Sequence, residues 1–237
     1  MVSEEIGSSA VVVMLTQTHE AGKEKCFQYY PLSPEESPLV IPRDDEIADD
    51  FQGEVQLQSV EHDSRSRSEI RRLRLRTSTA DGQRQDKLIH HLLFSGWPDF
   101  LIPEGDDRNA LVELIRLSAL LNRHPSTATS THTNGSTLAV DLASTDQDNP
   151  RIIHCSAGVG RSGTFIALDY LLSLMYAGQL DHLPAQTDPI ADTVDRLRMQ
   201  RMMMVQGESQ FNFLYEVLRE RFLDRLSGAD GPGGGVA

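Results

Sequence analysis

One short segment combines a nucleophile, small residues and an arginine in a spacing suited to phosphate chemistry. Cys155 is followed by five small residues and then by Arg161, between the β-branched pair Ile152-Ile153 and an apolar helical pattern. This order predicts a strand, a tight loop and a helix whose N-terminus points at the loop. Backbone N–H groups and a helix N-terminus attract anions, and they also lower the pKa of an enclosed thiol. The segment therefore predicts a thiolate nucleophile inside an anion site.

The arginine extends this prediction to phosphorus. The guanidinium of Arg161 is a planar fork that matches two oxygens of a phosphoryl group. A nucleophile inside a phosphate site implies attack on phosphorus, so the chemistry expected is that of a cysteine-dependent phosphatase. The groups expected to bind the phosphoryl oxygens are those of Ser156, Ala157, Gly158, Val159, Gly160 and Arg161.

Three other interpretations of the same segment are weaker. Gly158 to Gly163 matches the Gly-x-Gly-x-x-Gly pattern of dinucleotide sites, but Arg161 would crowd that turn and no acidic residue ends a second strand at the required distance. A nucleotide-binding loop would need a lysine that is absent. A buried structural cysteine, the commonest fate of a lone Cys, explains neither the glycines nor the arginine.

Composition narrows the function classes. The chain has 237 residues and a formal net charge of −13, which disfavours a general nucleic-acid role or binding to a membrane surface. Its two cysteines are Cys26 and Cys155, and a disulfide between them would remove the nucleophile. We therefore expect a reducing, cytoplasmic setting, with the nucleus also open, and we interpret Cys26 as a packed structural thiol.

A second short motif supplies a candidate acid. Thiolate attack on a phosphate ester requires a proton for the leaving group and an activated water afterwards. Asp99 lies on a turn set by Pro98 and anchored by the bulky Trp97. Alone, this turn is more often an ordinary Pro-Asp turn, but beside the cysteine loop it becomes the best candidate for the general acid.

The elements around these motifs predict an α/β fold, with a twisted mixed β-sheet flanked by helices. Apolar or alternating runs predict strands at Ala10–Leu15, Glu54–Val60, Arg72–Arg76 and Lys87–Phe94, and Leu32–Asp50 is interpreted as a surface connection. Helical spacing predicts helices at Asn109–Leu121, Thr164–Tyr176, Pro189–Met203 and Phe211–Leu226. The six arginines from Arg65 to Arg76 are interpreted as a solvated strand face, and the methionines from Met199 to Met204 as core filler.

Polar and glycine-rich stretches set the expected domain limits. The segment from about 125 to 149 is dominated by Ser, Thr, Asp and Asn, which predicts a disordered insertion in a loop. Residues 228–237 are glycine-rich and predict a flexible tail. We thus expect one catalytic domain over 1–227 with that insertion.

Four motifs in order resemble those of protein tyrosine phosphatases. His154 to Thr164, Trp97-Pro-Asp99, and Gln206-x-x-x-Gln210 are similar to the three principal loops of that family. The segment from Glu20 to Pro31 is similar to the loop that bears the family's Glu and Lys. Together with Leu197-Arg-Met-Gln-Arg-Met202, the insertion most resembles fungal members, some of which act on MAP kinases.

The resemblance implies a role for each matching residue. The nucleophile would be Cys155, Arg161 and the loop amides would bind phosphate, and Asp99 would be acid and then base. The supporting roles are stabilisation of the departing thiolate by Ser162, tuning of the thiol pKa by His154, placement of water by Gln206 and Gln210, and orientation of Arg161 by Glu20. Alternatives stay open for three of these residues. In them, His154 is a structural core histidine, and Glu20 and Gln210 are ordinary surface polar residues. No metal or cofactor is implied, and the expected partner is a phosphotyrosine-containing protein, with a MAP kinase among the substrates that the resemblance allows.

The resemblance also raises a question about the start of the chain. The family has a long stretch before the Ala10 strand, and residues 1–9 are too few to contain it, so the resemblance predicts a sheet lacking part of its usual structure. It would then expose apolar surface and an unpaired edge, and one wall of the substrate pocket would be absent. A weakly active or inactive phosphotyrosine-binding fragment is the alternative function, and a dual-specificity phosphatase is the third.

Overall fold

The fold is seen in a computed structural model, which describes residues 9–42, 52–78, 82–123 and 149–227. Most of the insertion predicted at about 125–149 and all of the tail predicted at 228–237 lie outside these residues. Among the described residues, no helix combines the length and the apolar character that crossing a membrane requires.

A mixed six-stranded sheet forms the base of the molecule. Its strand order is β4-β5-β6-β7-β1-β8. The first four strands are antiparallel neighbours, whereas β1 runs parallel to both β7 and β8. The strands are β1 (Ser9–Met14), β4 (Leu39–Ile41), β5 (Gln52–Asp63), β6 (Ser68–Ser78), β7 (Arg84–Phe94) and β8 (Ile152–His154), and a separate hairpin pairs β2 (His19–Glu20) with β3 (Lys23–Glu24). The predicted mixed α/β fold is confirmed.

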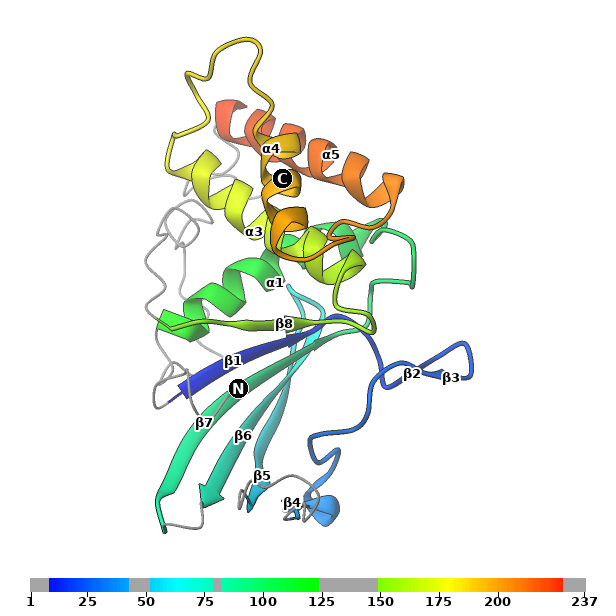
Figure 1. The fold of residues 1–237 in the computed structure, drawn as a ribbon, viewed down its shortest axis with the longest axis vertical. Helices are drawn as coiled ribbons and strands as arrows, with labels where there is room; N and C mark the ends of the chain where they lie inside the picture. Colours follow the sequence, from blue (N-terminus) through cyan, green and yellow to red (C-terminus); the bar gives the residue numbers. More distant parts are fainter. Residues whose placement is uncertain (1–8, 43–51, 79–81, 124–148, 228–237) are drawn as a thin grey trace.

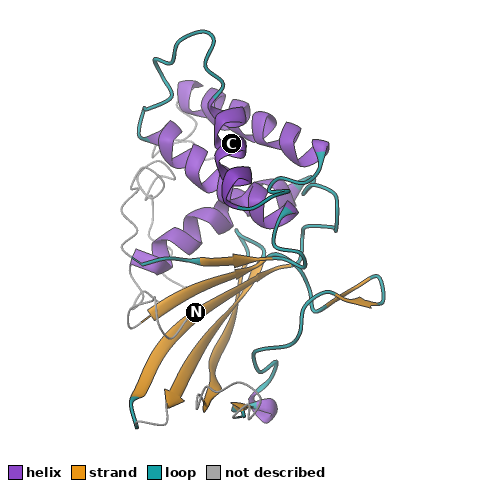
Figure 2. Cartoon of the chain, viewed as in Figure 1, coloured by secondary structure: helices purple, strands orange, loops and turns teal. Residues whose placement is uncertain are grey.

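The four α-helices of the described residues lie on one side of this sheet, and a short 3-10 helix (Pro34–Glu36) lies beside β4 (Figures 1 and 2). The α-helices are α1 (Asp106–Arg123), α3 (Gly160–Tyr176), α4 (Pro189–Gln200) and α5 (Glu208–Ser227). Helix α1 packs on β1 and β7, while α3 contacts α4 and α5. The β2–β3 hairpin projects away from the sheet, on the side where the strands β1 and β8 end (Figure 1).

The main core fills the space between sheet and helices. The apolar stripe predicted for α1 is buried, with Leu111, Leu114 and Ile115 inaccessible to solvent. Facing it, Val11 and Val13 project from β1 into the same cluster. Because side chains alternate along a strand, the neighbours of these valines project to the opposite face of the sheet.

That opposite face carries a second, smaller apolar cluster. It includes Val12 and Met14 from β1 and Ile89 from β7, and Tyr30 covers them from the segment that follows the hairpin. Cys26 is partly buried at the edge of this cluster, as a packed thiol would be. The Cys26–Tyr30 segment is therefore held against the sheet from the side opposite the helices.

Most predicted elements are present, and several have different bounds. Helix α3 begins at Gly160 rather than Thr164, so the anion loop runs directly into the helix. Helix α4 ends at Gln200, three residues before the predicted end, because Arg201 is in an extended conformation. The predicted connection at Leu32–Asp50 contains strand β4, which pairs with β5.

The prediction that the methionines fill the core was wrong for three of the four. Met204 is buried, but Met199, Met202 and Met203 are exposed. Met199 is exposed within the last turn of α4, whereas Met202 and Met203 lie beyond the early end of the helix and leave the predicted helical path.

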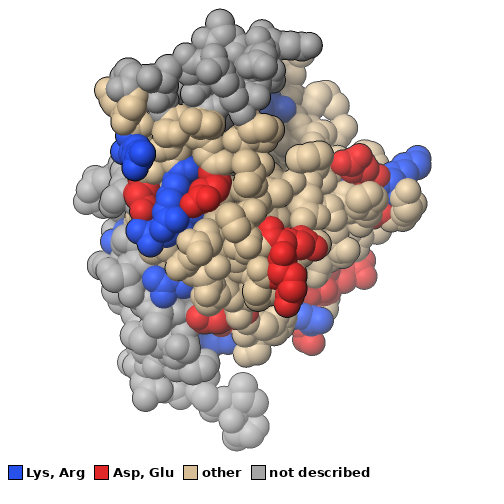
Figure 3. Space-filling view, turned by 90° about the horizontal axis from the view of Figure 1, so that it is seen from below, with Lys and Arg blue, Asp and Glu red and all other residues tan. Residues whose placement is uncertain are grey.

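Most of the arginines on the middle strands lie at the surface, and several pair with acidic residues. Arg74 makes a bidentate bond to Asp86, and Arg76 pairs with Glu54 on β5. Figure 3 shows such interleaving of basic and acidic side chains in a view from below. Arg71 is the exception to the predicted solvated face, since it is buried beneath the ring of Tyr30.

Candidate active site

The loop after β8 is shaped by its glycines. Gly158 has a φ of +69°, which a residue with a side chain adopts only with strain. A Cβ atom on Gly163 would lie 2.5 Å from the backbone nitrogen of Val205, so only glycine lets α3 approach that segment. The N–H groups of Gly163 and Val205 both donate to the carbonyl of Val159. These contacts hold the N-terminus of α3 against the cysteine loop.

Cys155 lies at the base of this loop and is 7% exposed. Burial opposes ionisation of its thiol, but the hydroxyl and N–H of Ser162, the N–H of Gly158 and the charge of Arg161 together lower its pKa. The Ser162 hydroxyl is buried and makes no hydrogen bond of normal geometry with the described residues. It is thus available to donate to the sulfur as negative charge develops there.

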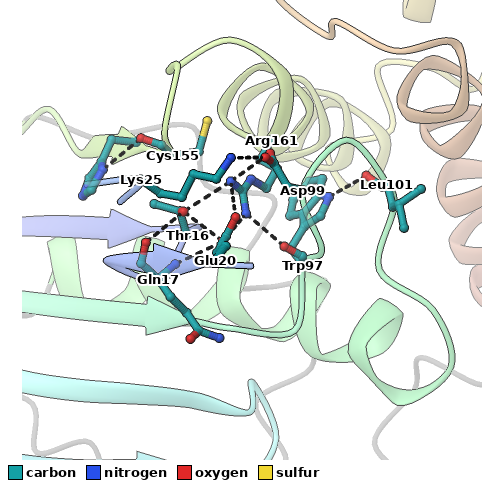
Figure 4. Close-up of polar contacts among 10 residues, drawn as sticks. Thr16, Gln17, Glu20, Lys25, Trp97, Asp99, Leu101, Cys155 and Arg161 are labelled. Carbon is teal, nitrogen blue, oxygen red and sulfur yellow. Dashed lines mark hydrogen bonds and ion pairs between the residues drawn. The ribbon is translucent and has the colours of Figure 1, made fainter. Parts of the chain in front are cut away.

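Arg161 is 2% exposed and is held from several sides (Figure 4). Its Nη1 donates to Glu20 Oε1 at 2.7 Å and to the carbonyl of Trp97 at 3.0 Å, and its Nη2 lies 3.2 Å from Glu20 Oε2. Thr16 accepts a bond from Nη2 and donates to Glu20. The guanidinium is therefore fixed at the end of the loop by a carboxylate 141 residues away in the sequence.

Glu20 is held in its ionised form. Burial would raise the pKa of its carboxyl, but hydrogen bonds from Arg161 and Thr16, the charge of Arg161 and the N–H of Gln17 lower it. Glu20 is the last residue of β2, and its ion pair with Arg161 joins the β2–β3 hairpin to the loop. The structure brings together the pair that the resemblance implied.

Asp99 reaches the same site from the turn after β7. Its Oδ1 lies 3.2 Å from Arg161 Nη2, and its Oδ2 lies 2.5 Å from Nζ of Lys25. The indole N–H of Trp97 donates to the carbonyl of Leu101, which closes the turn. Two cations thus hold the carboxylate beside the loop.

Sequence reasoning gave no role to Lys25. It lies within the Glu20–Pro31 segment that carries part of the family resemblance, and that position was the signal that could have found it. Its contact with Asp99 joins residues 74 positions apart, which no local pattern reveals.

The two glutamines lie on the far side of the loop. Gln210 is buried at the start of α5, and its side-chain oxygen accepts a bond from the N–H of Gly207. A Cβ on Gly160 would lie 3.1 Å from Gln210 Oε1 and 3.5 Å from Gln206 Oε1, so both amides face the loop backbone. Both line the same pocket as Cys155.

His154 lies on the other face of the sheet from the pocket. Its Nε2 is 2.6 Å from the hydroxyl of Tyr29, a residue that sequence reasoning had not singled out, and its Nδ1 is 3.4 Å from the carbonyl of Cys155. Burial lowers the pKa of His154, so its ring is neutral near pH 7.

Several of these side chains line a small pocket of about 90 Å³. Its walls are Lys25, Asp99, Phe100, Cys155, Ser156, Ala157, Gly160, Arg161, Gln206 and Gln210. Two larger, open hollows of about 590 and 550 Å³ lie on the strands, but their walls contain no thiol. The small pocket is therefore the candidate active site, where a thiol of lowered pKa lies with an arginine and the carboxyl group of Asp99.

Comparison with known proteins shows the family of the chain. A family model described as protein-tyrosine phosphatase matches residues 1–220. The chain therefore belongs to the protein-tyrosine phosphatase family. It is 30% identical to tyrosine-protein phosphatase 2 of Schizosaccharomyces pombe over 220 residues, and 29% identical to receptor-type tyrosine-protein phosphatase epsilon of Homo sapiens over 218 residues. These matches cover 92% and 91% of this chain but 25% and 24% of the relatives, so the chain spans about a quarter of their length.

Solved structures show the same fold. A protein tyrosine phosphatase of Trypanosoma brucei superposes with a TM-score of 0.65 at 25% identity, covering 96% of this chain and 65% of that one. Another, from Trypanosoma cruzi, gives a TM-score of 0.66 at 22% identity, covering 97% and 66%.

Proposed function

We propose that this chain is a protein tyrosine phosphatase that hydrolyses phosphotyrosine on proteins through a phosphocysteine intermediate. The observation that carries the proposal is the meeting of Cys155, Arg161 and Asp99 in one pocket. A nucleophile, a phosphate-binding cation and a proton donor are the three groups that two-step phosphoryl transfer requires.

The first step breaks the ester bond. The loop N–H groups and Arg161 bind the phosphoryl oxygens, and the phosphoryl group takes the place of the Asp99 oxygen on Arg161. The Cys155 thiolate then attacks phosphorus while the phosphorus–oxygen bond to tyrosine breaks, and Asp99 protonates the departing oxygen. The tyrosine leaves and the phosphoryl group remains on sulfur.

The second step regenerates the thiol. Gln206 and Gln210 position a water on the open side of the phosphocysteine, and Asp99, now a carboxylate, accepts its proton. The water oxygen bonds to phosphorus as the phosphorus–sulfur bond breaks, and the Ser162 hydroxyl stabilises the returning thiolate. Phosphate is released.

Cysteine substitutions test the mechanism directly, because the chain has only two cysteines. Phosphate release from a phosphotyrosyl peptide should proceed in EDTA, and Cys155→Ser should abolish turnover while the peptide still binds. The matched control is Cys26→Ser, which should keep turnover because Cys26 lies outside the pocket walls. Turnover by Cys155→Ser would contradict the proposal.

The same assay separates the alternatives. A phosphotyrosine-binding fragment would bind the peptide without releasing phosphate, and a longer polypeptide with additional N-terminal residues would then be far more active. A dual-specificity enzyme would cleave phosphothreonine peptides at a comparable rate. We expect a strong preference for phosphotyrosine, in a reducing cellular location that keeps Cys155 as a thiol. A MAP kinase is one substrate to test, on the basis of the resemblance to fungal members.

A further inference from the structure

A buried chain of polar side chains connects the phosphate loop to the middle of the sheet. The Tyr29 hydroxyl lies 2.6 Å from His154 Nε2 and 2.9 Å from His91 Nε2. His91 projects from β7 on the face that also carries His154, and it is inaccessible to solvent. Its Nδ1 has no hydrogen-bond partner among the described residues. The proposed mechanism uses neither Tyr29 nor His91.

We propose that His91 is a positioning residue of the active site, which fixes the tautomer of His154 through the Tyr29 hydroxyl. The role given to His91 rests on the proposed phosphatase function. The hydrogen-bond geometry itself involves only His91, Tyr29 and His154. Each neutral imidazole carries its proton on one of two ring nitrogens, and the hydrogen bonds around the ring decide which one.

The Tyr29 hydroxyl has one proton to share between two ring nitrogens. Burial raises the pKa of this phenol, so the proton stays on it near neutral pH. Met14 Sδ also lies 3.8 Å from the Tyr29 oxygen, but a thioether sulfur is a much weaker acceptor than an imidazole nitrogen, so the hydroxyl donates to one histidine and accepts from the other. Two arrangements of the chain meet this condition.

In the first arrangement, His91 Nε2–H donates to Tyr29, and Tyr29 donates to His154 Nε2. The remaining proton of His154 is then on Nδ1, which faces the Cys155 carbonyl at 3.4 Å and can donate to it. Three hydrogen bonds form. The unprotonated Nδ1 of His91 is the atom left without a partner among the described residues.

The second arrangement reverses both bonds of the Tyr29 hydroxyl and loses the bond to the Cys155 carbonyl. His154 Nε2–H donates to Tyr29, which leaves the lone pair of His154 Nδ1 facing the lone pairs of the Cys155 carbonyl. The proton of His91 then moves to Nδ1, where a buried N–H would have no acceptor among the described residues. This arrangement has one hydrogen bond fewer and strands a buried donor, which costs free energy. The first arrangement is therefore favoured.

The surroundings keep His91 neutral, as this arrangement requires. Burial, with smaller contributions from Arg71 and His154, lowers its pKa to about 3. Arg71 occupies the facing position on β6 and pairs with Glu69. The ring of Tyr30 lies against His91, with centroids 4.2 Å apart. Tyr29, Tyr30, Arg71 and His154 are thus the titratable groups that face this imidazole.

The consequence for the site is a fixed donor beside Cys155. With His91 in place, the His154 Nδ1–H group points its positive end at the Cys155 peptide, which holds the loop and favours the thiolate. Without the His91 N–H, the Tyr29 oxygen is open to accept from His154, and only the Cys155 carbonyl still favours the Nδ1 proton. His154 then populates both tautomers, and the thiol pKa rises.

The test measures the thiol rather than turnover. In a Cys26→Ser background, the pH dependence of alkylation by iodoacetamide reports the pKa of Cys155 alone. We expect His91→Leu and Tyr29→Phe to raise this pKa by about half to one unit, the range of one hydrogen bond. His91→Gln retains an amide N–H, so its Cys155 pKa should lie close to the parental value. His90→Gln, at the neighbouring position that projects to the other face, should leave the pKa unchanged.

Two results would overturn the inference. One is a His91→Leu variant that is folded by circular dichroism and has the parental thiol pKa. The other needs no variant: nitrogen-15 NMR of the parent protein should find the His154 proton on Nδ1, and a proton on Nε2 would refute the arrangement. A chain that alkylates as expected but releases no phosphate would contradict the proposed function and leave this inference standing.

Discussion

The ammonium of Lys25 lies 2.5 Å from the carboxylate of Asp99, which joins the β2–β3 hairpin to the turn that follows β7. Both side chains are mostly buried. Since Asp99 also contacts Arg161, the position of the proposed acid depends on two cations from different parts of the chain.

Removal of this contact should slow the chemical step. We expect Lys25→Met to lower kcat about tenfold with a small change in KM, because a charge-assisted hydrogen bond that positions the acid is lost. Lys23→Met is the matched control, since Lys23 is exposed on the same hairpin. Steady-state kinetics with a phosphotyrosyl peptide measure both, and an unchanged kcat for Lys25→Met would show that Asp99 needs no such anchor.

The effect of replacing the general acid on kcat should depend on the leaving group. Asp99→Asn removes the proton donor, so kcat should fall roughly 10²- to 10⁴-fold with a phosphotyrosyl peptide. The loss should be much smaller with an aryl phosphate whose phenol is strongly acidic, since that group leaves unprotonated. An equal loss with both substrates would assign Asp99 a role other than proton transfer.

Glu20→Gln should destabilise the fold as well as the site. The substitution leaves the buried Arg161 without its main counter-charge, which costs roughly 3 kcal/mol of unfolding free energy. Glu24→Gln, at an exposed position of the same hairpin, is the control. Urea denaturation followed by circular dichroism measures both, and equal stabilities would contradict the prediction.

The contribution of Glu20 to the free energy of unfolding should also depend on pH. Its pKa is lower in the folded chain than in the unfolded chain, so its contribution is present above the ordinary value of about 4.3 and is lost as pH falls through the folded pKa. The difference in stability between the parent and Glu20→Gln should therefore shrink below about pH 4. A constant difference across this range would refute the assigned shift.

Ser162→Ala should weaken the thiolate. The Ser162 hydroxyl is one of the groups that lower the Cys155 pKa, so its removal moves that pKa up toward the ordinary value of about 8.5. The rise of alkylation rate with pH should shift to higher pH in the variant. A profile identical to that of the parent would show that the hydroxyl does not act on the sulfur.

Two glycines near the loop should differ in whether substitution by alanine is tolerated. Gly163→Ala would place a Cβ 2.5 Å from the Val205 nitrogen, so α3 must move and unfolding free energy should fall by about 1–3 kcal/mol. At Gly207 the nearest atom to an added Cβ is 3.6 Å away, and Gly207→Ala should be tolerated. Thermal unfolding compares the two, and equal melting temperatures would contradict the expected clash at Gly163.

Local patterns predicted the parts of the fold that local physics controls. The buried strand β1 and the apolar stripe of α1 follow from periodicity, because burial on one or both faces leaves a regular trace in the sequence. The same reasoning failed for Met199, Met202 and Met203, which are exposed. Met202 and Met203 lie beyond the extended Arg201, and periodicity carries no information about where a helix ends, while Met199 lies on the exposed side of the last turn of α4.

By itself, the sequence determined the cysteine loop and its setting between a strand and a helix, since the small residues and the terminal arginine act on close neighbours in the chain. The family membership followed from motifs of the same kind. Only the tertiary structure decided that Glu20 contacts Arg161, that Lys25 contacts Asp99, and that Tyr29 bridges His91 and His154. These contacts join residues 62 to 141 positions apart, and they depend on strand order and side-chain packing rather than on any local pattern.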